Sequence, residues 1–107
     1  MVLNRQGAMR MLGIDPESYD ELLAIMRSEL CNWLDYFSET GGNGLDVMRS
    51  RAHRLKSDAA NIGAERVRHT ARALEQSIRE GQDEGSVEHF RRVLVQDLRD
   101  LQREIGP

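Results

Sequence analysis

The residues of this sequence that could do chemistry gather around one histidine in the segment Ala52–Ala64. Lys56 and Ser57 follow His53 by three and four residues, and side chains at these spacings share one face of an α-helix. An imidazole is nucleophilic near neutral pH, and a neighbouring ammonium group attracts the negative charge of a phosphoryl group. The spacing therefore predicts a site where His53 takes up a phosphoryl group, stabilised by Lys56 and by a hydrogen bond from Ser57.

An amphipathic helix is expected to carry this histidine. Apolar residues recur at spacings of three and four at Leu45, Met48, Ala52, Leu55, Ala59 and Ile62. This pattern predicts a helix from about Leu45 to Ile62. At about 100° per residue, His53 points roughly 130° away from the centre of the apolar face, so we expect it in solvent. Arg49 one turn before and Ala60 two turns after make the expected surface basic and low in relief.

The same residues resemble the histidine-containing phosphotransfer (HPt) domains of bacterial and fungal phosphorelays. That family carries an Ala-His-x-Leu-Lys-Gly motif, followed by small residues and a Leu/Ile-Gly-Ala ending. The matching residues here are Ala52, His53, Leu55, Lys56, Ala60, Asn61, Ile62, Gly63 and Ala64. Ser57 stands where glycine is usual, and Asp58 stands where a small residue is usual. Serine is small and Asp58 is expected to point away from His53, so neither should prevent approach of a partner.

The resemblance implies a phosphoryl carrier that accepts and donates at His53, through Nε2, with aspartates of receiver domains. Those receivers belong to response regulators or hybrid sensor kinases, and they are expected to supply Mg²⁺, so this chain needs no cofactor of its own. The sequence has no glycine-rich nucleotide loop and no paired carboxylates beside His53, so no autokinase activity is expected. In related domains a polar residue of the next helix borders the histidine; Glu75 and Gln76 both remain candidates here.

The charge of the chain is unevenly distributed. Residues 49–72 carry seven basic and two acidic side chains, whereas the whole chain has a net charge of −3. This favours attraction of an acidic partner. The residues predicted to dock that partner are Arg49, Arg54, Ala60, Arg72, Glu75, Gln76 and Arg79. Binding of nucleic acid is not expected, because the chain is acidic overall and no aromatic residues alternate with the arginines.

The rest of the chain predicts an all-α, antiparallel up-down-up-down four-helix bundle with a short extra N-terminal helix. The 107 residues are expected to form a single domain, 1–107. The expected helices are 4–12, 16–39 after an Asp15 cap, 45–62, 64–78, and a last one capped by Ser86 and ending at Ile105. The segment Thr40–Gly44 is expected to be a flexible loop, and Gly63 to end the histidine helix in a tight connection.

Two sets of apolar residues are assigned to packing. Met9, Met11 and Leu12 are expected to cover one end of the bundle. Trp33 and Phe37 stand at helical spacing in the series Tyr19, Leu22, Met26, Leu30, Trp33 and Phe37. A ligand site built on these aromatics is conceivable, but such a stripe is far more often core.

Several functional classes are disfavoured. No apolar run reaches the ~20 residues that span a bilayer, no secretory signal is evident, and the lone Cys31 has no partner for a disulfide. We expect a cytoplasmic, monomeric, free-standing protein. Glu65 and His69 have a spacing that can bind metal, but no Glu-x-x-His pair is present, so no metal site is expected. The alternative function is a helical adaptor that binds a response regulator or sensor kinase without carrying phosphate.

Overall fold

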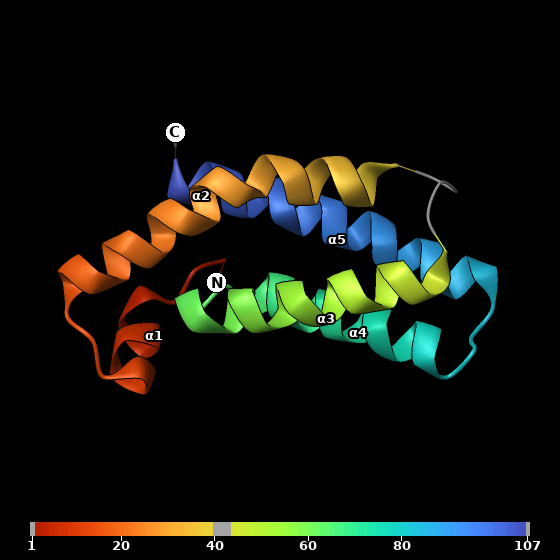
Figure 1. Ribbon diagram of the computed structural model, residues 1–107, viewed down its shortest axis with the longest axis horizontal. Helices are drawn as coiled ribbons and strands as arrows, with labels where there is room; N and C mark the ends of the chain where they lie inside the picture. The colour runs from red at the N-terminus through yellow and green to blue at the C-terminus, as the bar shows by residue number, and fades with distance from the viewer. Residues whose placement is uncertain (1, 40–43, 107) are drawn as a thin grey trace.

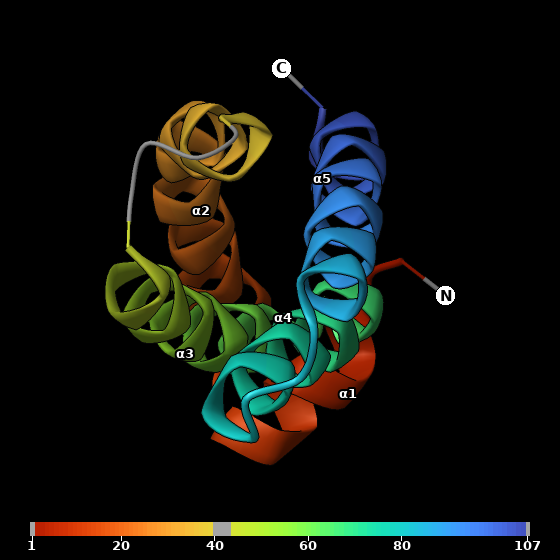
Figure 2. The ribbon, with the colours of Figure 1, turned by 90° about the vertical axis from the view of Figure 1, so that its right-hand side faces the viewer.

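Five α-helices make up the part of the chain that the structure describes. The computed structural model describes residues 2–39 and 44–106, so the predicted loop at 40–44 lies outside it except for Gly44. The helices are α1 (Arg5–Leu12), α2 (Pro16–Ser38), α3 (Leu45–Ile62), α4 (Glu65–Arg79) and α5 (Glu84–Ile105). The helices α2 to α5 run side by side in alternating directions (Figure 1), at the four corners of a bundle (Figure 2). The predicted four-helix bundle with a short N-terminal helix is confirmed.

Side chains just before three of the helices set where those helices begin. The Asn4, Asp15 and Asp83 side chains accept hydrogen bonds from the backbone N–H groups of Gly7, Ser18 and Ser86, at 3.0, 2.8 and 2.8 Å. Such caps satisfy N–H groups that have no partner within the helix. The prediction that Ser86 caps the last helix is wrong. The Asp83 carboxylate reaches the N–H of Ser86, so α5 begins three residues earlier than expected.

Gly63 makes the tight connection between α3 and α4. Its φ of +78° is left-handed, a conformation that residues with a Cβ rarely adopt. Its carbonyl accepts a 2.8 Å hydrogen bond from the N–H of Asn4, and a Cβ here would lie only 2.3 Å from the Asn4 carbonyl oxygen. Both constraints require glycine. Together they fix the antiparallel α3–α4 hairpin and hold the start of α1 against it.

The core of the bundle follows the predicted apolar faces, with exceptions near their ends. Leu45 is 55% exposed and lines a surface groove together with Gly85 at the start of α5. Met11 and Leu12 are 67% and 37% exposed. The last turn of α1 extends beyond the end of α3 (Figure 1), and Leu3 and Ala8 provide the buried contacts instead.

In α2, Leu23 is buried where the pattern favoured Leu22, which is half-buried against the core. The remaining predicted residues of this series are Tyr19, Met26, Leu30, Trp33 and Phe37, and all of them are buried. The prediction that the aromatic stripe packs in the core is therefore confirmed for Trp33 and Phe37.

A buried arginine joins the end of α2 to α5. Arg91 is 6% exposed, and its Nη1 donates a 2.6 Å hydrogen bond to the carbonyl of Phe37. Its Nε donates to Glu88 at 2.8 Å. Arg91 therefore satisfies a carbonyl in the last turn of α2 that has no partner in the helix, while Glu88 balances its charge.

Replacing Arg91 by methionine should destabilise the fold, because the Phe37 carbonyl loses its donor and Glu88 loses its main partner. We expect a loss of about 2 kcal/mol in the free energy of unfolding, measured by urea denaturation followed by circular dichroism. Arg92→Met is the matched control, since Arg92 also pairs with Glu88 but its side chain is 75% exposed. It should cost no more than about 0.5 kcal/mol. Equal losses in the two variants would contradict the assigned role of Arg91.

Stability should also fall in acid through Glu88. Hydrogen bonds from Arg91, followed by those from Arg92, lower the pKa of Glu88 from 4.5 to about 2. A carboxylate whose pKa is lower in the folded state stabilises the fold above its unfolded pKa and loses that contribution as the pH falls toward 2. The difference in urea midpoint between the wild type and Glu88→Gln should therefore be largest near neutral pH and shrink between pH 4.5 and 2. A difference that does not change with pH would refute this linkage.

Candidate functional site

His53 lies on the solvent face of α3. Its neighbours Ala52 and Leu55 are fully buried, whereas the His53 side chain is 60% exposed. Lys56 lies on the same side, one turn further along, and its side chain is 27% exposed. Periodicity alone accounts for this arrangement, since burial of the apolar face turns these two polar side chains outward.

A buried carboxylate from α4 joins the side chains of this face. Glu75 is only 4% exposed. Its Oε1 lies 2.8 Å from Nδ1 of His53 and accepts a 2.6 Å hydrogen bond from Nη2 of Arg79. Its Oε2 accepts a 3.0 Å hydrogen bond from Nζ of Lys56. Of the two candidates for the position beside His53, the structure places Glu75 there, while Gln76 is exposed and bonds to Glu80.

Close packing of α3 against α4 brings Glu75 to this position. Ala52 and Ala59 on α3 and Ala71 on α4 are fully buried, and their small side chains let the two backbones approach each other. The turn at Gly63 then sets which residues lie level with each other. The arrangement explains how a residue 22 positions along the chain from His53 reaches its ring.

The environment of Glu75 favours its ionised form. Burial raises the pKa of the Glu75 carboxyl, but hydrogen bonds and positive charge from Lys56 and His53 outweigh this and hold its pKa below its ordinary value. An ionised carboxylate can only accept hydrogen bonds. The Nδ1 of His53 must therefore carry a proton and donate it, which leaves Nε2 with the free lone pair of the neutral ring.

Most of the other predicted site residues line two surface cavities that both include Glu75 and Arg79. Arg49 and Ser50 line a surface cavity of about 280 Å³ with His53, Glu75 and Arg79. A second cavity of about 160 Å³, on the other side of Glu75, is lined by Lys56, Arg72, Glu75, Gln76 and Arg79. Cationic side chains therefore surround the histidine face where it adjoins α4.

Ser57, Ala60 and Arg54 complete the predicted set. The Ser57 hydroxyl donates a long 3.4 Å hydrogen bond to the backbone carbonyl of His53, so in this conformation its proton points at the helix. Ala60 is half-buried. Arg54 is turned toward α2, with its guanidinium carbon 5.9 Å from the centre of the Trp33 ring. Arg54 therefore lies away from the His53–Glu75 cluster. Sequence periodicity did not indicate this direction of the Arg54 side chain.

The chain belongs to the Hpt domain family: the family model described as "Hpt domain" matches residues 10–104. Hpt domains are helical bundles that act in histidine phosphotransfer of two-component phosphorelays, and they interact with receiver domains and kinases. No significant match was found among curated proteins or among solved structures.

The described residues hold neither a metal-binding cluster nor a helix that could span a membrane. Within residues 2–39 and 44–106, no three His, Cys, Asp or Glu side chains lie close enough together to hold a metal ion. Glu65, one of the two residues with metal-binding spacing, is paired with Arg68 at 2.8 Å. No helix in the same ranges is long and apolar enough to cross a membrane.

Removal of the Glu75 side chain should change which nitrogen of His53 carries the proton. In Glu75→Ala, Nδ1 loses its acceptor, so the preference for the Nδ1–H tautomer should disappear. Long-range ¹⁵N–¹H correlation spectra of the neutral ring, with folding checked by circular dichroism, measure this directly. Gln76→Ala is the matched control and should retain the wild-type tautomer. An unchanged tautomer in Glu75→Ala would show that Glu75 does not orient the ring.

Proposed function

We propose that this chain carries a phosphoryl group on Nε2 of His53 between receiver-domain aspartates of a phosphorelay. The observation that supports it most is the pairing of a solvent-exposed imidazole with a buried carboxylate at Nδ1, at 2.8 Å. This pairing directs the free lone pair to Nε2, the position a partner can reach. Membership in the Hpt family supplies the reaction class.

In the proposed step, the Nε2 lone pair attacks the phosphorus of an aspartyl phosphate. The N–P bond forms as the P–O bond to the aspartate breaks, and the aspartate leaves as a carboxylate. Because Nδ1 keeps its proton, the phosphorylated ring of His53 becomes positively charged. The Glu75 carboxylate already lies against that proton, so it stabilises the charge as it develops without having to move. The return step, from His53 to a second aspartate, runs through the same atoms in reverse.

Lys56 and Arg79 are proposed to stabilise the phosphoryl oxygens. Glu75 contributes one negative charge against the two positive charges of these side chains, so the cluster is net positive even when the ring of His53 is neutral. Both cations are held close to the ring by the same carboxylate. Ser57 can add one hydrogen bond by rotating its hydroxyl away from the His53 carbonyl.

The remaining parts of the proposal concern the partner. The receiver domain is expected to supply Mg²⁺ and its acidic ligands, as the family resemblance implies, and this chain is expected to have no autokinase activity. Arg49, Arg72 and Arg79, with Gln76 and Ala60, are proposed to meet the acidic face of the receiver. Arg54 is left out of this docking set because it is turned toward α2.

His53→Gln tests the proposal. Incubation with a phosphorylated receiver should label the wild type with an acid-labile, base-stable phosphate, and the variant should take up none. The melting temperature should hardly change, because His53 is exposed and glutamine can still bond to Glu75. His89→Gln, a change at an exposed histidine of α5, is the matched control and should be labelled like the wild type.

The same experiment separates the phosphoryl carrier from the adaptor. An adaptor would bind the receiver tightly, and mass spectrometry would find no phosphate on the wild-type chain. Labelling that persists in His53→Gln would instead show that the phosphoryl group is carried by another residue.

A further inference from the structure

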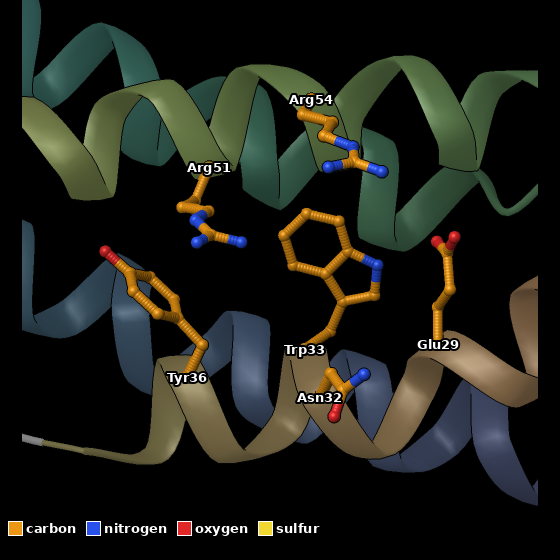
Figure 3. A pocket seen from close by; sticks show the side chains of 6 residues that line it. All are labelled: Glu29, Asn32, Trp33, Tyr36, Arg51 and Arg54. Atoms are coloured by element: carbon orange, nitrogen blue, oxygen red, sulfur yellow. The ribbon is translucent and has the colours of Figure 1, made fainter.

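A groove between α2 and α3, on a different side of α3 from His53 and Glu75, has the features of a ligand site. A cavity of about 150 Å³ lies between the two helices and is lined by Glu29, Asn32, Trp33, Tyr36, Arg51 and Arg54. Figure 3 shows Trp33 and Tyr36 extending from α2 toward Arg51 and Arg54 on α3. The guanidinium carbons of Arg51 and Arg54 lie 5.4 and 5.9 Å from the ring centres of Tyr36 and Trp33 respectively.

Two of the residues that line this groove each carry a buried hydrogen-bonding atom without a partner. These are Nε1 of Trp33 and the hydroxyl of Tyr36, and in the part of the chain that the structure describes they are the only buried side-chain nitrogen or oxygen atoms left so. Trp33 is only 5% exposed. Burial raises the pKa of the Tyr36 hydroxyl, so it remains a donor. Buried donors are normally paired. Figure 3 shows Nε1 of Trp33 on the side of Glu29 and the Tyr36 hydroxyl pointing away from Trp33, so a small ligand between the two rings cannot accept a hydrogen bond from both.

The arginines of the groove are weakly neutralised. Arg54 meets the carboxylate of Asp58 only at 4.0 Å, and Arg51 has no carboxylate within ion-pair distance among residues 2–39 and 44–106. Their planar guanidinium groups suit a carboxylate, which they can bind with two parallel hydrogen bonds. Glu29 lies on the side of the indole that carries Nε1 (Figure 3). Its charge opposes a dianion such as phosphate more strongly than a monoanion.

The size of the cavity limits the rest of the ligand. A volume of about 150 Å³ is comparable to that of an engineered protein cavity that holds benzene. The aromatic rings of Trp33 and Tyr36 offer apolar surface that an inorganic anion would not cover. We propose that the α2–α3 groove binds a small monocarboxylate whose flat apolar body is about the size of a benzene ring. The proposal does not depend on phosphotransfer at His53.

Benzoate is the probe, and Trp33 is the reporter because it is the only tryptophan in the chain. Its indole N–H gives a single side-chain peak in a ¹⁵N–¹H correlation spectrum. Benzoate should shift this peak in a saturable way with a Kd on the order of 1 mM. Arg51→Ala and Arg54→Ala should each weaken binding about tenfold, with circular dichroism confirming that both variants fold. Arg99→Ala, which removes an exposed arginine of α5, should leave the Kd unchanged.

Two further ligands define the chemistry of the site. Benzamide has the same shape without the charge and should bind at least about tenfold more weakly if the arginines hold a carboxylate. Inorganic phosphate at equal ionic strength should also bind more weakly, because it lacks the apolar body. The proposal is overturned if benzoate leaves the indole peak unmoved at about twenty times the expected Kd. It is equally overturned if benzamide or phosphate matches benzoate, or if neither arginine variant weakens binding.

Discussion

The candidate site depends on one buried carboxylate. A carboxylate removed from water is unfavourable unless positive groups and hydrogen bonds compensate for the lost solvation. Glu75 meets this requirement with the exposed side chains of His53 and Arg79 and the half-buried side chain of Lys56, all within 3.0 Å. The compensation works in both directions, because the groups that make burial of Glu75 tolerable are also held in place by it. Three flexible side chains on two helices thereby become one ordered cluster, with the imidazole at its solvent edge.

This cluster depends on the close packing of α3 against α4. Alanines replace larger apolar residues along the contact, and Gly63 turns the chain within two residues. A residue with a Cβ at position 63 would meet the carbonyl of Asn4, so the turn and the placement of α1 are coupled. The structural role of Gly63 is thus to position Glu75 against His53, although neither side chain contacts it.

The two sides of α3 have different characters. Toward α4, one buried carboxylate neutralises part of the positive charge, and the cations surround a nucleophilic ring. Toward α2, Arg51 and Arg54 lie over the rings of Tyr36 and Trp33, and within residues 2–39 and 44–106 no buried carboxylate pairs with them. The stacking holds the guanidinium groups in place without neutralising their charge. The basic segment that looks uniform in the sequence is therefore divided by the fold into two surfaces with different chemistry.

Helical periodicity determined much of this arrangement from the sequence alone. The bounds of α3, the exposure of His53 and the position of Lys56 on the same face follow from the repeat of the helix, because these are relations within a single element. Tertiary structure decided which residue of α4 meets His53, because a one-residue difference in how two helices pair exchanges Glu75 for Gln76. Tertiary structure also decided the direction of the Arg54 side chain. An arginine on the border between two faces of a helix turns toward the neighbouring helix that offers it an aromatic ring or a carboxylate, and α2 offers the ring of Trp33. Contacts between helices depend on how far apart the helices pack and on which residues lie level with each other. The spacing of residues within one helix determines neither.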